Sequence, residues 1–128
     1  MNTMYIFSIA KNFKHISNLK SDVLLDLAFT ADIIWGSHMG FTLIECALAG
    51  TPIIAYDWEW HSEFLKNDKN GILIPFKNID QFASKTLELL RNPERAKELG
   101  ARGRKDAEDL HSWEKVKRAW EIGFYDRL

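Results

Sequence analysis

The fold of this chain depends on residues 31–57, which read ADIIWGSHMGFTLIECALAGTPIIAYD. Asp32 to Trp35 is an apolar, β-branched run of the kind found in strands that are buried on both faces. Phe41 to Ala49 has helical spacing, with apolar side chains on one face. Pro52 to Tyr56 is a second strand-like run. A strand, a turn, a helix and a strand within about 25 residues predict a short parallel crossover unit.

The turn between the first strand and the helix is bracketed by Gly36 and Gly40, which allow the backbone to turn tightly. Gly50 stands where helices end in a left-handed residue, and Pro52 prevents the helix from continuing. In open parallel sheets, ligands bind beyond the carboxyl ends of the strands, where a turn meets a helix. We therefore expect residues 37–43 to face a ligand.

Similar signals flank the central unit on both sides. They predict strands at 4–9 and 72–74, and helices that start with a Ser21 or Asp22 cap, at Ile79, at Pro93 and after a Ser112 cap. A helical turn is expected to close at Phe64 and Leu65. Strands that alternate with helices predict an α/β fold: a partial Rossmann-like parallel sheet, flanked by helices and ending in two or three C-terminal helices. Three strands are few for an independent doubly wound sheet, so residues 1–128 are expected to form a single partial domain.

Composition narrows the class of protein. The 128 residues are 46% hydrophobic and 12% aromatic, which is enough for a packed core and argues against disorder. A formal charge of −1 argues against a dedicated nucleic-acid binder. A single cysteine excludes an internal disulfide, and no apolar run is long enough for a signal peptide or a membrane span. These features favour a soluble, cytoplasmic protein.

The run SHMGFTLIECALAGTP, residues 37–52, resembles the donor-site signature of retaining GT-B glycosyltransferases, especially the large family 4, or group 1, set. That signature reads Glu-x-Phe-Gly, four further residues, Glu-Ala, a few small residues and Gly-x-Pro. Later landmarks are also similar: Ser62-Glu63, Asn70-Gly71 followed by Ile-Leu-Ile-Pro, and Ser-Trp-Glu at 112–114. The resemblance extends from about Asp32 to the C-terminus and depends on several motifs in the right order.

The resemblance implies that the chain holds a nucleoside-diphosphate sugar. Free amides at the start of the helix would cradle a phosphate or a sugar oxygen, with the Thr42 hydroxyl as a further donor. Glu45, one turn into the helix, would accept hydrogen bonds from the two ribose hydroxyls. The donor-binding residues expected on this basis are Ser37, His38, Gly40, Phe41, Thr42, Leu43 and Glu45.

Two departures from the family pattern bear on catalysis. The family's first Glu falls on Ser37, and a serine cannot supply a negative charge beside the anomeric carbon. The basic pair that neutralises the pyrophosphate in relatives has no convincing match. No catalytic residue is assigned for these reasons.

The resemblance implies a hexosyltransferase that acts with retention on a saccharide or a lipid-linked acceptor. The chain would work with a missing N-terminal acceptor domain or subunit and be inactive without it. Besides the nucleotide-sugar substrate, it would need no cofactor and no metal, and it would bind no nucleic acid. The full enzyme could associate peripherally with a membrane. A GT-B-like sugar-nucleotide epimerase fragment and a non-catalytic nucleotide- or partner-binding module remain alternatives.

Other residues with chemical potential have plainer interpretations. Cys46 lacks a basic partner and is expected to be a small buried helix residue. His61 with Glu59 and Glu63 does not match the spacing of a closed metal site. Of Trp58 and Trp60, one is expected to pack inward while the other faces a cleft or solvent. The closing helix is apolar on more than one side, so the isolated chain is expected to self-associate.

Overall fold

The computed structural model describes residues 12, 14 and 16–122 of the chain. It contains a three-stranded parallel sheet built from β1 (Ile34–Gly36), β2 (Ile53–Asp57) and β3 (Ile72–Pro75), in the order β1-β2-β3. In the register, Ile34 lies opposite Ile53, and Ile54 lies opposite Ile72. The α/β class and the parallel sheet are therefore confirmed. The strand expected at 4–9 lies outside the described residues.

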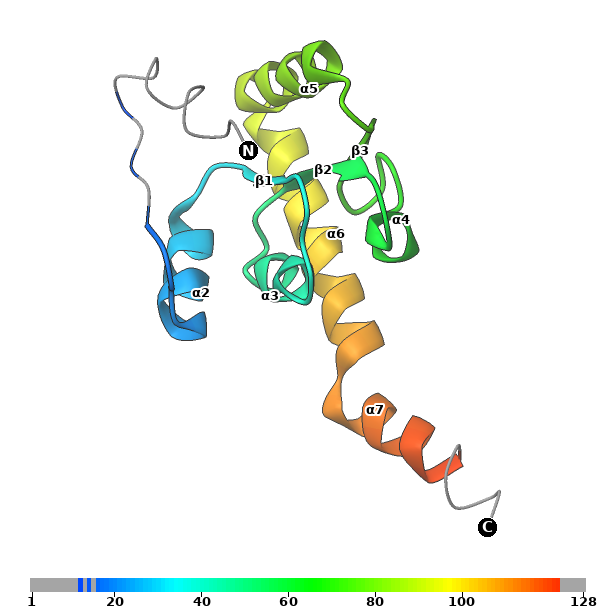
Figure 1. The fold of residues 1–128 in the computed structure, drawn as a ribbon. Coiled ribbons are helices and arrows are strands. Elements are labelled where there is room, and N and C mark those ends of the chain that lie inside the picture. Colours follow the sequence, from blue (N-terminus) through cyan, green and yellow to red (C-terminus); the bar gives the residue numbers. More distant parts are fainter. Residues whose placement is uncertain (1–11, 13, 15, 123–128) are drawn as a thin grey trace.

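Helices cover both faces of this sheet (Figure 1). The helices are α2 (Ser21–Thr30), α3 (Thr42–Leu48), α4 (His61–Phe64), α5 (Ile79–Arg91), α6 (Pro93–His111) and α7 (Trp113–Trp120). The three C-terminal helices predicted from the sequence are present. None of the helices in the described ranges combines the length and apolarity needed to cross a membrane.

Alternation along the strands produces two cores, one on each face of the sheet. On one face, Ile53 and Ala55 of β2 pack with buried residues of α3, among them Ile44 and Ala47. On the other face, Ile54 packs with residues of β3 and of α5. A central strand that is apolar on both faces is the expected sequence of a buried parallel strand.

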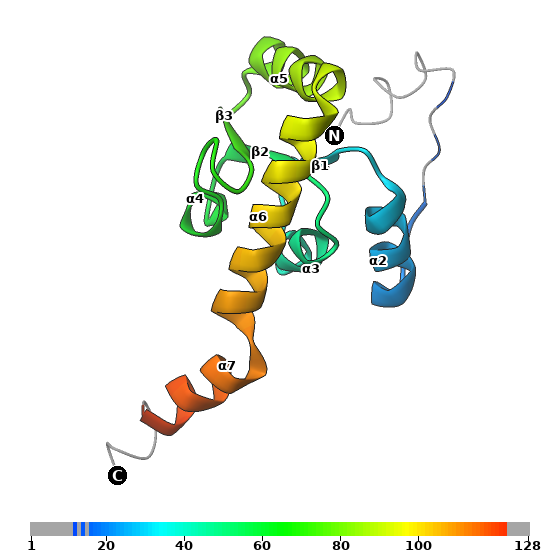
Figure 2. The ribbon, with the colours of Figure 1, turned by 180° about the vertical axis from the view of Figure 1, so that it is seen from behind.

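Helix α6 contributes to both cores. Leu99 packs with the cluster beneath α5, whereas Ala107, two turns later, packs with the cluster beneath α3. Figure 2 shows α6 running past the sheet from α5 toward α7. Asn92 caps this helix, because its side-chain oxygen accepts the Arg95 amide at 3.1 Å, and Pro93 occupies the first helical position as predicted.

Most predicted boundaries agree with the structure, and two differ. The first strand begins at Ile34 rather than Asp32, where the Ile34 amide donates to the Pro52 carbonyl at 2.9 Å. The predicted cap of α2 is wrong: Lys20 precedes the helix, and no side chain caps it. The predicted cap of α7 is confirmed, because the Ser112 hydroxyl accepts the Lys115 amide at 3.4 Å.

The turn after α3 has the predicted left-handed residue, since Gly50 has a φ of 75°. Helix α6 approaches this turn closely at Gly100. A Cβ atom added at Gly100 would lie 2.0 Å from the Gly50 carbonyl oxygen. Only glycine therefore lets α6 pack here, and this contact fixes the crossover unit against the C-terminal helices.

Candidate functional site

The residues predicted to face a ligand form the β1–α3 loop, defined here as residues 37–41. It lies at the carboxyl edge of the sheet, directly after β1 and before α3. Ser37, His38 and Gly40 are exposed, and the side chain of Phe41 is 84% exposed. No protein atom lies within 4 Å of a Cβ position built on Gly40. This corner of the molecule is open, as a ligand site requires.

The amides at the start of α3 are only partly available. The Leu43 amide donates to the Gly40 carbonyl at 3.0 Å, so it is not among the free amides expected at the start of this helix. The helix begins with a tight turn that uses the Leu43 group internally. The amides of Gly40, Phe41 and Thr42 donate to no acceptor within the described part of the chain. Three backbone donors, together with the half-buried Thr42 side chain, therefore remain for a ligand.

Glu45 lies one turn into α3 and is half-buried. Its carboxylate makes no hydrogen bond or ion pair with any residue that the structure describes. The Glu45 charge acts on the neighbouring residue Cys46, whose side chain is buried as predicted. Burial raises the pKa of the Cys46 thiol above its usual value, and the Glu45 charge raises it further. The thiol is thereby kept protonated, which argues against a nucleophilic role.

His38 contacts the loop that follows β2. Its Nδ1 lies 3.4 Å from a carboxylate oxygen of Glu59, a residue in the left-handed region with a φ of 52°. Both side chains are largely exposed, so this contact contributes little to stability. The contact shows that the loops after β1 and β2 lie close together at the same edge of the sheet.

His61 is a buried residue with no accessible surface. Its Nε2 accepts the Met39 amide at 3.0 Å, and its Nδ1 lies 2.8 Å from the Tyr56 carbonyl oxygen. Both ring nitrogens are therefore engaged by the backbone. Among the residues that the structure describes, no three His, Cys, Asp or Glu side chains gather as a metal site would require. The sequence pattern singled out His61 but missed its contact with the β1–α3 loop.

Trp58 and Trp60 have the two predicted environments. Trp60 packs against the core beneath α3, while Trp58 is 41% exposed and stacks on Phe76 with ring centroids 4.1 Å apart. Phe76 directly follows β3, so this aromatic pair joins the ends of two neighbouring strands. It extends the carboxyl edge beyond the β1–α3 loop.

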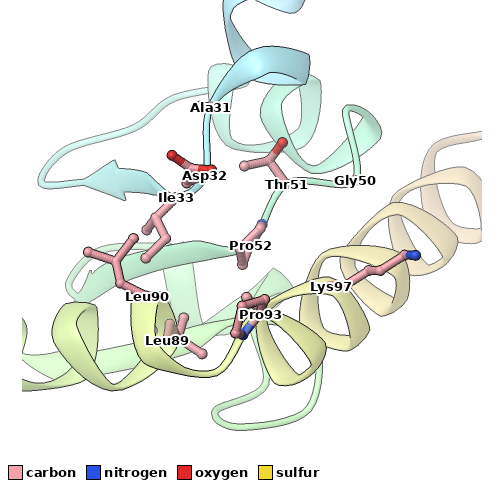
Figure 3. Close-up of a pocket in the computed structure, with 11 residues that line it drawn as sticks. Ala31, Asp32, Ile33, Gly50, Thr51, Pro52, Leu89, Leu90, Pro93 and Lys97 are labelled. Carbon is pink, nitrogen blue, oxygen red and sulfur yellow. The ribbon is translucent and has the colours of Figure 1, made fainter.

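A cavity of about 270 Å³ lies at the opposite, amino edge of the sheet (Figure 3). It is lined by the segments that lead into β1 and β2 and by the junction of α5 and α6. Ile33, Pro52 and Leu90 make much of its wall apolar, and the Lys97 side chain points away from it (Figure 3). The Thr51 hydroxyl donates to the Ala28 carbonyl at 2.6 Å. Because its lining lies at the amino edge of the sheet, this cavity is separate from the candidate site at the carboxyl edge.

The sequence from residue 7 to residue 106 matches the family model described as glycosyl transferases group 1. The chain belongs to this family. The group 1 glycosyl transferase match covers the sheet, the β1–α3 loop, α3 and most of α6, so the residues of the candidate site lie inside the matched region.

Two curated relatives show what enzymes carry such a domain. The poly(ribitol-phosphate) α-N-acetylglucosaminyltransferase of Staphylococcus aureus is 33% identical over 82 residues, which are 63% of this chain and 17% of that protein. A GDP-mannose-dependent α-(1-6)-phosphatidylinositol monomannoside mannosyltransferase of Mycobacterium tuberculosis is 32% identical over 66 residues, 52% of this chain and 17% of that protein. The group 1 glycosyl transferase chain thus spans less than a fifth of the length of either relative.

Solved structures agree with this placement. Sucrose-phosphate synthase from Thermosynechococcus elongatus superposes with a TM-score of 0.81 at 21% identity, over 96% of this chain and 31% of that one. At this level of identity, the similarity is evidence for a shared fold only. Staphylococcus aureus TarM, solved with fondaparinux, α-GlcNAc-glycerol and UDP, superposes with a TM-score of 0.72 at 26% identity, over 77% of this chain and 21% of that one. The half-domain architecture expected of a GT-B enzyme is therefore confirmed for the group 1 glycosyl transferase chain.

Proposed function

We propose that this group 1 glycosyl transferase domain binds a nucleoside-diphosphate sugar at the carboxyl edge of its sheet. The observation that carries the proposal is the open corner at Gly40, where three unused backbone amides lie in the segment that precedes Glu45. An anion binds well to converging amides, and a carboxylate accepts hydrogen bonds from a vicinal diol. A relative's dependence on GDP-mannose and the UDP in the TarM crystal support this class of ligand.

The proposed reaction transfers a hexose with retention to a saccharide or lipid-linked acceptor. Amides that are fixed before the reaction can stabilise the negative charge that develops on the departing diphosphate, because they need not reorganise as the bond breaks. Thr42 would add a hydroxyl donor. Ser37 would hydrogen-bond the donor sugar without adding charge, which makes diphosphate stabilisation the main contribution of this domain.

The proposed enzyme contains a further, N-terminal acceptor-binding domain or subunit. The chain covers less than a third of sucrose-phosphate synthase and less than a fifth of the two curated relatives, so most of the length of such enzymes lies outside it. Residues 1–128 would then be one partial domain of the whole. Without the partner domain, the chain is proposed to bind the nucleotide but not to transfer sugar.

Thermal unfolding in the presence of UDP, GDP or ADP tests the proposal. A ligand present at about 100 times its dissociation constant stabilises the folded state by about 2.7 kcal/mol, which raises the midpoint of unfolding measurably. We expect such a shift with at least one of the three diphosphates and none with the matching nucleoside. A folded protein whose midpoint is unchanged by all three would contradict the nucleotide-binding function.

Ser37 favours a second candidate function, a non-catalytic nucleotide-binding module. Here the serine occupies the position at which the family's first Glu is expected to assist the reacting sugar. The two candidates differ in an enzyme reconstituted with an acceptor domain. A transferase should respond to Ser37→Glu with a changed transfer rate, whereas a binding module should show no transfer with either residue.

A further inference from the structure

Two consecutive side chains from the segment that follows β2, those of Trp60 and His61, bind the backbone of Met39. The Met39 amide donates to Nε2 of His61 at 3.0 Å, and the Met39 carbonyl accepts the indole N–H of Trp60 at 2.9 Å. Met39 is the central residue of the β1–α3 loop. One residue of the loop therefore has both of its backbone polar groups bound to side chains that lie about twenty positions further along the chain.

His61 is itself fixed in orientation. Since its Nε2 accepts a hydrogen bond, its proton resides on Nδ1, which donates to the Tyr56 carbonyl at 2.8 Å. Tyr56 belongs to the central strand β2. A continuous line of hydrogen bonds thus connects the middle of the sheet, through a fully buried imidazole, to the loop.

The Met39 side chain supplies a third point of attachment. It packs against the core beneath α3 and lies over Gly36, where an added Cβ atom would be 2.5 Å from the Met39 sulfur. The neighbours Ser37, His38 and Gly40 are all exposed. The loop is therefore anchored at its centre and open to solvent on both sides of the anchor.

We propose that Trp60 and His61 are positioning residues that hold the β1–α3 loop in the conformation that binds the donor. The inference rests on the proposed function, since it concerns the same site. A loop that is already ordered loses less conformational freedom when a ligand binds, so its affinity is higher. Neither side chain needs to touch the ligand for this effect, because both act through the backbone of Met39.

Two substitutions at His61 separate the two hydrogen bonds. In His61→Gln, the amide oxygen can take the place of Nε2 and accept the Met39 amide. In His61→Asn, the shorter side chain can take the place of Nδ1 and donate to Tyr56 but cannot reach Met39. Both variants put a neutral amide into the same buried space. If His61 were needed only for packing, the two variants should therefore show the same amide hydrogen exchange in the β1–α3 loop.

A substitution at Trp60 tests the other half of the anchor. Trp60→Phe removes the indole N–H while keeping an aromatic ring in the core. Trp58→Phe is the matched control, because Trp58 is the exposed neighbour and its indole N–H has no hydrogen-bond partner among the described residues. Since Trp60→Phe leaves His61 and its hydrogen bonds in place, it also serves if His61→Asn fails to fold.

The measurements are amide hydrogen exchange of residues 37–42 and titration with UDP, GDP and ADP, made on the 128-residue chain. We expect exchange at Met39 to accelerate at least tenfold in His61→Asn, and exchange across the loop to accelerate in Trp60→Phe. Exchange should stay near wild type in His61→Gln and Trp58→Phe. The dissociation constant of the nucleotide that binds should rise about three- to tenfold in the first two variants, in line with the loss of one hydrogen bond.

The exchange data keep this inference separate from the proposed function. Equal loop exchange in all four variants would overturn the anchoring role, whether or not any diphosphate binds. Accelerated exchange with an unchanged dissociation constant would overturn the positioning role. A wild-type chain that binds none of the three diphosphates would overturn the proposed function and, with it, the assignment of the loop to a donor.

Discussion

Glu45 is the side chain on which the choice of ligand class depends most. It is half-buried, and its charge is felt by the adjacent Cys46 thiol, whose pKa it helps to raise. Glu45 has no partner among the described residues. Withdrawing a carboxylate partly from water costs free energy unless a ligand or solvent forms hydrogen bonds with it. The two hydroxyls of a ribose would do so with two charge-assisted hydrogen bonds.

Glu45→Gln should weaken nucleoside-diphosphate binding about tenfold. The amide keeps the size and one acceptor oxygen of the carboxylate but loses the charge that strengthens both hydrogen bonds. Isothermal titration with the nucleotide that stabilises the wild type measures the change. Glu63→Gln, at an exposed position of α4, is the control and should leave the dissociation constant unchanged. Equal affinities for wild type and Glu45→Gln would remove the ribose contact from the proposal.

Some single-residue features were predictable because their causes are local. The left-handed conformation of Gly50 and the Ser112 cap follow from residue types at fixed offsets from a helix end. The internal use of the Leu43 amide was not predictable, because it depends on how tightly the first turn of α3 winds. The role of His61 was also hidden, since a hydrogen bond to Met39 joins segments that only the folded sheet brings together.

The elements pack through a small number of close contacts, of which the approach of α6 to the Gly50 turn is the tightest described here. The pattern of helix-start signals at Ile79, Pro93 and Ser112 located α5, α6 and α7 well. It did not reveal which helix would lie across the end of α3. From the sequence alone, Gly100 and Gly103 predict only a less stable stretch within a charged helix. In the structure both glycines face backbone atoms of neighbouring turns.

Gly100→Ala should destabilise the protein strongly, by about 3 kcal/mol or more, because the added methyl group would collide with the backbone of Gly50 rather than with a flexible side chain. Gly40→Ala is the matched control for stability and should change the free energy of unfolding by less than about 0.5 kcal/mol, since the space beside Gly40 is open. Urea denaturation of both variants measures the difference. Similar midpoints for the two variants would show that α6 can shift away from the turn.

At the scale of the whole molecule, the described residues leave a large amount of apolar surface uncovered. Trp35 of β1 is 64% exposed and Trp113 of α7 is 73% exposed, and within the described sheet β1 pairs with a neighbour on one side only. The sequence predicted a partial sheet and an uncovered closing helix. It could not predict how exposed each aromatic side chain is, because exposure depends on how the helices pack in the folded chain.

The isolated chain should self-associate at high concentration, since burial of exposed aromatic side chains is favourable and an uncovered strand edge can pair with another copy. Sedimentation velocity across a hundredfold range of concentration should show a rising weight-average sedimentation coefficient. Trp113→Gln should reduce this rise, because the substitution removes the most exposed tryptophan of those described. A sedimentation coefficient that corresponds to a monomer at every concentration would contradict the prediction.

The position of α6 has a consequence for how this small molecule comes apart. Leu99 and Ala107 of this helix pack against opposite faces of the sheet, so neither face can be fully exposed while the helix stays packed. Detaching the helix would expose both layers together. The three short strands and the helices on both of their faces are thereby joined into a single cooperative unit.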